Sequence, residues 1–168
     1  MFAKNNNKED YLLANIENKV FSLINEKVNQ IGYEIYDIIY EKVAKDYYLR
    51  IFIDNQNGID LEDCEKVSRY VSDILDEEDF IKEAYFLEVS SPGVERFLRK
   101  DTQLEKEIGN LVEISLFKTM FNYKVHTGEL LGFNKNEIEI NVNGDKRKFE
   151  RKDISQIKTK FIWDDGGK

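Results

Sequence analysis

Hydrophobic residues in the first half of the chain follow two different periods. Over residues 11–31, and again over 61–75, they recur at steps of three and four, which predicts two amphipathic helices. Three further segments alternate apolar and polar side chains and predict strands: 33–43, 47–54 and 84–90. The resulting order, α-β-β-α-β, predicts a sandwich in which two helices cover one face of a three-stranded sheet.

Cap and turn residues mark the ends of these elements. Gly32 directly follows the first helix, where a glycine C-cap is common. Asp60 precedes the second helix and Asp63 stands three residues later, the spacing of an N-terminal cap. After the last strand, Pro92 and Gly93 suit the second and third positions of a turn, so we expect the first domain to end there.

The second half of the chain contains short segments of period two and no long helical stripe. Strands are predicted at 112–116, 124–133, 137–142, 146–149 and 156–162. Asn143-Gly144 is a strong hairpin signal, and 151–155 fits a single helical turn. About five strands in this length predict a small closed barrel. The whole chain is therefore predicted to be an α+β two-domain protein with domains 1–92 and 108–168 and a charged linker, 93–107.

Composition narrows the chemistry. The 168 residues contain one cysteine, Cys64, and one histidine, His126, which excludes an intramolecular disulfide and most zinc or nucleophile–base sites. We expect Cys64 to be a small core residue and His126 to lie at the surface or rim of the barrel. A carboxylate metal site stays open as an alternative around Asp54, Asp60, Glu62, Asp63 and Glu65, although a loop and a capped helix need the same residues. No cofactor motif is found.

Charge separates the two halves. The net charge is −8, but residues 1–90 carry 10 Lys and Arg against 20 Asp and Glu, and residues 91–168 carry 15 against 13. The first half therefore repels phosphate, and the second half can approach it. The chain has no apolar run long enough to cross a membrane and no apolar segment near its start, so a cytoplasmic location is expected.

Positive residues in two places are candidate contacts for RNA or an acidic surface. The candidates are Ser90, Ser91, Gly93, Arg96, Arg99 and Lys100 at the junction, and Lys118, Lys124, Lys146, Arg147, Lys148, Arg151 and Lys152 in the second half. The junction is either a recognition loop or a turn that aims a solvated linker. Phe117, Phe121 and Tyr123 lie among the second group, where they could stack on bases or fill the barrel core.

Several segments resemble the ribosome maturation factor RimP family, above all residues 87–96 with Ser90-Ser91-Pro92-Gly93. The resemblance spans nearly the whole chain. It implies an Sm-like carboxy-terminal barrel and a non-catalytic factor. We also expect a monomer without cofactor, metal or small-molecule substrate. The implied partners are the RNA and protein of the immature small ribosomal subunit. Two alternatives remain: a ring-forming Sm-like RNA regulator, or a metal-dependent RNA-processing hydrolase.

Overall fold

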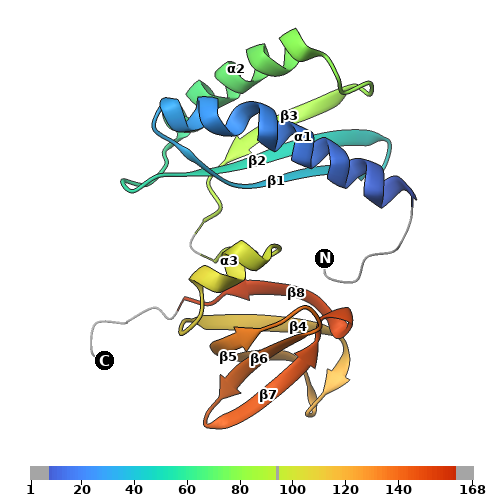
Figure 1. The fold of residues 1–168 in the computed structure, drawn as a ribbon, viewed down its shortest axis with the longest axis vertical. Helices are drawn as coiled ribbons and strands as arrows, with labels where there is room; N and C mark the ends of the chain where they lie inside the picture. Colours follow the sequence, from blue (N-terminus) through green and yellow to red (C-terminus); the bar gives the residue numbers. More distant parts are fainter. Residues whose placement is uncertain (1–7, 94, 162–168) are drawn as a thin grey trace. The chain divides into compact units, whose positions relative to one another are not determined.

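The computed structural model describes residues 8–93 and 95–161, and it shows two compact units that meet between Pro92 and Gly93 (Figure 1). Each unit has its own hydrophobic core. Among the residues described, no helix is long and apolar enough to span a membrane. The first seven and last seven residues lie outside the described residues. The last predicted strand, 156–162, ends within the second of these segments.

The first unit has the predicted order of elements. They are α1 (Lys8–Gln30), β1 (Glu34–Val43), β2 (Asp46–Asp54), α2 (Leu61–Glu78) and β3 (Tyr85–Ser90). The sheet has the strand order β1-β2-β3, with β1 antiparallel and β3 parallel to β2. The second helix is therefore the crossover between two parallel strands, and the predicted α-β-β-α-β arrangement is confirmed (Figure 1).

Both helices pack on one face of this sheet. The core joins Val20 and Ile24 of α1, Val67 and Val71 of α2, and the inward side chains of β2, of which Ile51 is fully buried. Asp60 and Asp63 form the predicted cap: the Asp60 carboxylate accepts from the Asp63 backbone N–H at 2.8 Å, and Asp63 accepts in return from Asp60 at 2.9 Å. The cap satisfies backbone donors that the first turn of a helix leaves open.

A β-bulge changes the face of β1. The sequence places Ile35 and Ile39 on one face of a regular strand, but the register shifts between Ile35 and Asp37. Beyond this shift, Ile38 and Tyr40 point into the core and Ile39 lies opposite Arg50 on the outer face. The predicted alternation was therefore wrong over half of this strand, because one extra residue exchanges the two faces.

The second unit contains one five-stranded antiparallel sheet. Its elements are α3 (Asp101–Lys106), β4 (Leu111–Met120), β5 (Tyr123–Phe133), β6 (Glu137–Val142), β7 (Asp145–Glu150), the single turn η1 (Arg151–Asp153) and β8 (Ile154–Thr159). The strand order is β7-β6-β5-β4-β8. Asn143 and Gly144 both have positive φ, 52° and 92°, which confirms the predicted hairpin turn.

The sheet is not a closed barrel. Its outermost strands are β7 and β8, and no ladder joins them among the pairings of the described strands. The closed barrel predicted from the strand count is therefore corrected to an open sheet. The apolar side chains of this sheet are covered partly by the segment that precedes it, since Leu98 and Leu104 are buried with Ile114 and Phe149 in one core.

The segment predicted as a linker is therefore structured in its second part. Leu98 donates its backbone N–H to the carbonyl of Ile157 at 2.8 Å, and Phe97 forms an isolated bridge with Lys158. The helix α3 follows. Apolar side chains within the charged segment thus belong to the core of the second unit. Gly93 has the positive φ, 80°, that the predicted turn needs, but residues 91–93 are not assigned to a turn.

Candidate nucleic-acid interface

The tip of the β4–β5 hairpin exposes aromatic and basic side chains together. Phe117, Phe121 and Tyr123 are 50%, 51% and 64% exposed, and the Lys118 and Lys124 side chains beside them are also exposed. Neither lysine forms an ion pair with any described residue. These five residues are called the hairpin surface. Exposed rings beside unpaired cations can stack on bases and contact phosphates.

The backbone of the hairpin explains this exposure. The β4–β5 register shifts between Ser115 and Met120, so the end of β4 leaves the regular ladder. Phe121 and Asn122 form the turn with φ 49° and 69°. A bulky side chain is uncommon in the left-handed region and needs neighbours that hold it. The neighbours of Phe121 are the rings of Phe149 and His126, at centroid distances of 5.9 and 6.0 Å.

His126 is the buried support of the hairpin surface. It is only 2% exposed, and its imidazole lies 4.9 Å from the Phe149 ring centroid. Nε2–H donates to the carbonyl of Tyr123 at 3.0 Å, and Nδ1 accepts from the Arg147 guanidinium at 2.9 Å. Both partners fix the neutral Nε2–H tautomer. The expected surface or rim position was wrong, because His126 occupies an inward position of β5, in phase with buried Gly128 and Leu130.

Arg147 connects β7 to the hairpin surface. Its guanidinium carbon lies 5.2 Å from the Phe121 ring centroid, and the same guanidinium donates to His126. A cation over an aromatic face is attracted by the ring quadrupole, and the guanidinium keeps other N–H donors beyond the one given to His126. The structure thus brings three of the predicted cations together with the rings: Lys118, Lys124 and Arg147.

The other predicted cations of the second unit lie elsewhere or have acidic partners. Lys146 is exposed and has no ion pair among the residues described. Lys148 lies 4.0 Å from Glu139, and Lys152 lies 3.0 Å from Glu150. Their charges are therefore partly neutralised locally.

Arg151 has a structural position. Its side chain is 17% exposed, donates to Asp101 of α3 at 2.7 Å and lies 5.5 Å from the Phe133 ring centroid. A guanidinium held in this way ties η1 to the start of α3. This surrounding leaves Arg151 less available to a phosphate than the lysines of the hairpin surface.

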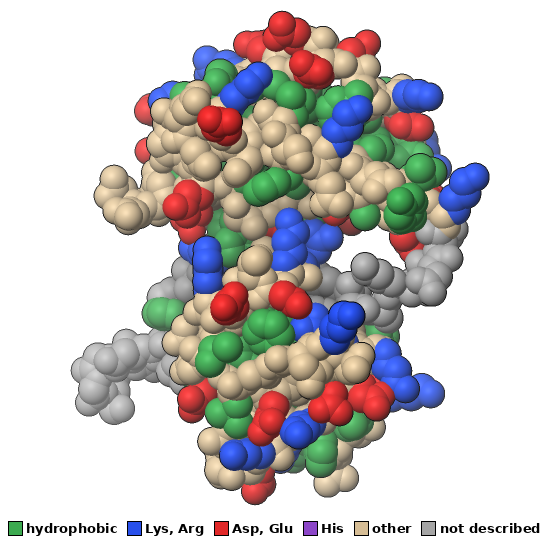
Figure 2. Space-filling view, in the orientation of Figure 1, with side chains coloured by type: hydrophobic (Ala, Val, Ile, Leu, Met, Phe, Trp, Pro, Cys, Tyr) green, Lys and Arg blue, Asp and Glu red, His purple; other side chains and the backbone are tan. Residues whose placement is uncertain are grey.

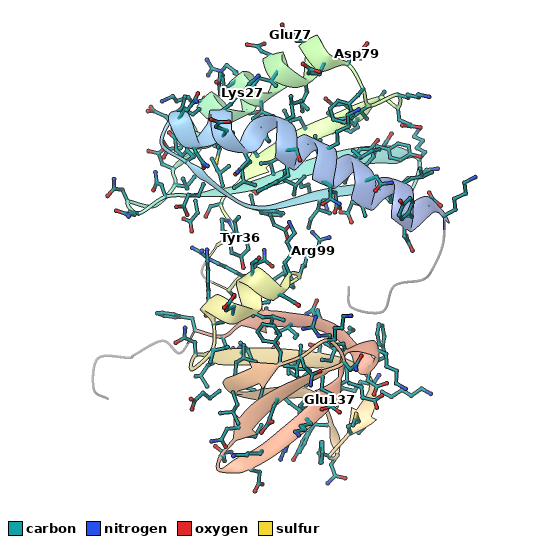
Figure 3. The ribbon with its side chains drawn as sticks, viewed as in Figure 1. Lys27, Tyr36, Glu77, Asp79, Arg99 and Glu137 are labelled. Atoms are coloured by element: carbon teal, nitrogen blue, oxygen red, sulfur yellow. The ribbon has the colours of Figure 1, made fainter. Side chains whose placement is uncertain are left out.

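The junction candidates make local hydrogen bonds. The Arg96 Nε–H donates to the carbonyl of Gly93 at 3.1 Å, and the backbone N–H groups of Arg99 and Lys100 donate to Gln103 Oε1 at 2.7 and 3.0 Å. Figure 3 labels Arg99, which comes from the segment before α3. Backbone donors that could have held a phosphate are thus taken by Gln103.

Ser90 ends β3, and it is exposed, as are Ser91 and Gly93. These three positions lie where the first unit ends and the second begins. Exposure is compatible with both interpretations of this junction: a recognition loop, or a turn that sets the direction of the following segment.

The acidic residues of the first unit serve its structure. The Tyr33 hydroxyl donates to Asp63 Oδ1 at 2.5 Å, and this bond, followed by burial, raises the pKa of Tyr33 to about 12. The N–H of Asp60 and the Tyr33 hydroxyl together lower the pKa of Asp63. Burial raises the pKa of the half-buried Cys64 thiol. Within the described ranges, no three His, Cys, Asp or Glu side chains are grouped as a metal site would need.

Surface charge differs between the units. Figure 2 shows acidic side chains at the top of the first unit, and Figure 3 labels Glu77, in the last turn of α2, and the C-cap residue Asp79. On the second unit the same view shows acidic, basic and hydrophobic side chains interspersed.

Comparison with known families adds one finding to this geometry: residues 23–95 match the family model described as the RimP N-terminal domain.

Proposed function

Because the chain belongs to the RimP family of ribosome maturation factors, we propose that it binds the immature small ribosomal subunit and assists its late assembly without catalysing a reaction. In this proposal the chain acts as a monomer in the cytoplasm and recognises both ribosomal RNA and ribosomal protein. The second unit is an Sm-like domain, which its five short antiparallel strands and single core support.

The hairpin surface is the proposed contact with RNA. The observation that carries this proposal is the exposure of Phe121 and Tyr123 beside Lys118 and Lys124, all on one hairpin tip. Phosphate contacts alone bind every nucleic acid, whereas stacking needs a base that is not already stacked in a duplex. A site with several exposed rings and few cations therefore favours unpaired segments, which an unfinished particle offers.

The first unit is the proposed contact with protein. Its excess of Asp and Glu repels RNA phosphates and attracts the basic surfaces typical of ribosomal proteins. The two units thus meet the two components of a ribonucleoprotein. A factor that binds the unfinished form more tightly than the finished form shifts the population between them, and it needs no reaction centre to do so.

Affinity purification of the tagged full chain from cells tests this function. We expect immature small subunits to be enriched over mature ones. A variant with Phe121→Leu and Tyr123→Leu should lose most of this enrichment, and a variant with Phe161→Leu, an exposed aromatic residue elsewhere in the second unit, should keep it. Recovery of mature whole ribosomes, or of no ribosomal particle, contradicts the proposal. A stable ring of six or seven copies in light scattering favours the Sm-like RNA regulator instead.

A further inference from the structure

We propose that the free edge of β3 and the groove beside it bind an extended basic polypeptide segment, which adds to the first unit as a fourth strand. The binding geometry stands on the first unit alone, whereas the assignment of this segment to a protein of the assembling subunit rests on the proposed function. The argument has three steps: an open edge, an apolar groove along it, and a charge that selects the occupant.

The two edges of the sheet differ. On β1, the Tyr40 N–H donates to Glu17 Oε1 at 2.9 Å, and the Ile38 N–H donates to Asp37 Oδ1 at 2.8 Å. Together with the bulge at Asp37, these bonds occupy the edge donors and distort the strand, as natural proteins do to prevent edge pairing. On β3, no hydrogen bond outside the ladder with β2 involves the backbone of any described residue from Tyr85 to Ser90. The β3 edge is therefore open to another strand.

A groove of about 520 Å³ runs along this edge between β3 and α2. Its lining includes Leu87 and Val89 of β3 and Leu61 and Cys64 of α2. Leu87 and Val89 are only half-buried, and Leu61 is 76% exposed. An added strand would place every second side chain over these apolar groups, because strand side chains alternate between the two faces.

Charge selects what the groove accepts. Glu65 and Glu88 line it, and residues 1–90 have an excess of ten negative charges. Arg69 also lines the groove and is paired with Glu65 at 3.4 Å, and Glu88 is paired with Arg50 at 2.9 Å. These pairs are partly neutralised, so the attraction for a basic segment comes mainly from the overall negative charge of this half of the chain. RNA and a second copy of this acidic unit are both repelled. A segment that alternates apolar and basic residues fits both faces: its apolar side chains enter the groove, and its cations lie on the face that Glu88 shares.

A synthetic peptide of alternating Val and Lys tests the inference with the full chain. We expect the peptide to bind in fluorescence anisotropy and to slow amide hydrogen exchange in β3, but not in β1. A peptide of the same composition with all Lys residues in one block and all Val residues in another should bind about tenfold more weakly, because it cannot present one face to the groove.

Backbone pairing is tested with two further peptides, N-methylated at alternate residues in the two possible registers. Each keeps its charge and side chains, but one of them loses the N–H groups that face β3. We expect that peptide alone to lose binding by about tenfold or more. Equal binding of both methylated peptides shows a purely electrostatic attraction and overturns the inference.

Protein variants locate the site. Ser68 lines the groove, and Ser68→Phe should fill it and weaken peptide binding by about tenfold. Glu65→Gln should weaken it by a few-fold, while the matched control Glu26→Gln, an exposed change on α1, should not. Circular dichroism establishes that each variant is folded.

Other occupants give different results. Protection of β3 that grows with protein concentration, without peptide, shows pairing between two copies and overturns the inference. Protection of the same amides by oligouridine overturns it in favour of RNA. If the peptide fails to bind while tagged protein still recovers immature subunits, the inference is refuted and the proposed function stands. If the peptide binds but tagged protein recovers no ribosomal particle, the strand-binding inference stands and the proposed function is refuted.

Discussion

The hairpin surface predicts how RNA affinity depends on salt. The perturbation is Lys118→Gln with Lys124→Gln, which removes two exposed cations that have no acidic partner among the described residues. The control is Lys148→Gln with Lys152→Gln, which makes the same change of charge at two lysines that already face Glu139 and Glu150. Both variants therefore have the same net charge.

The magnitude follows from counterion release. Each phosphate contact on single-stranded nucleic acid contributes about 0.7 to the slope of log affinity against log salt, so two contacts contribute about 1.4. Between about 50 and 200 mM salt, that difference amounts to about sevenfold: the native chain should lose about seven times more affinity than the Lys118→Gln, Lys124→Gln variant. The control variant should retain nearly the native slope.

Fluorescence anisotropy with a labelled oligouridine, repeated over a series of salt concentrations, measures both slopes. Net charge changes equally in both variants, so a general electrostatic effect lowers both slopes together. A phosphate contact at the hairpin surface lowers only the slope of the Lys118→Gln, Lys124→Gln variant. If the Lys118→Gln, Lys124→Gln variant keeps the native slope, these side chains do not contact phosphates, and the assignment of the hairpin surface to RNA is refuted.

Two further predictions concern stability. A Cβ at Gly128 would lie 2.4 Å from the carbonyl oxygen of Asn141, so Gly128→Ala should lower the free energy of unfolding in urea by about 1–3 kcal/mol. Gly132→Ala on the same strand should not lower it, because a Cβ there would have no atom within 4 Å. Equal stability of the two variants contradicts this packing. The pKa of Tyr33 rises from 10.0 to about 12 on folding, so its hydrogen bond to Asp63 stabilises the protein below pH 10 and loses that effect as the pH rises from about 10 to 12. Tyr33→Phe should therefore lose less stability over this pH range in urea titrations. An unchanged pH profile contradicts the assignment.

Local patterns predicted the elements of this protein well. The helical spacing that ends at Gly32, the cap at Asp60 and the turn at Asn143 and Gly144 all depend on residues close together in sequence, and all are present. Each of these features is fixed by backbone preferences or by one side chain bonding within its own turn.

The features that were missed depend on register. A bulge beside Asp37 exchanged the faces of β1, and the alternation of apolar residues cannot reveal where one residue is extra. Similarly, the buried position of Leu104 was hidden in a charged segment, because a single apolar residue in a short helix carries no periodicity. Barrel closure depends on pairing between strands far apart in the sequence, which a strand count does not determine.

The candidate site shows the same division. Sequence identified Lys118 and Lys124 as cations near aromatic residues, but it could not decide whether Phe121 and Tyr123 face the core or solvent. Only the structure brings Arg147 to Phe121. That choice depends on the register shift before the turn, which ends the regular alternation. The role of His126 as a support was equally hidden, because its hydrogen bond with Arg147 joins β5 to β7, whose residues lie far away in the sequence.

The balance of charges and rings on the hairpin surface bears on how the chain could leave a finished particle. Stacking on one exposed ring contributes about 1–3 kcal/mol per base, which is an affinity factor of roughly five to one hundred and fifty. Phosphate contacts persist when RNA pairs, but stacking on Phe121 or Tyr123 is lost once the base joins a duplex. Two lysines without an ion pair among the described residues give few phosphate contacts, so we expect stacking to make up a large share of the affinity at this surface. Under the proposed function, pairing of the bound segment weakens the complex directly, and we expect release without nucleotide hydrolysis.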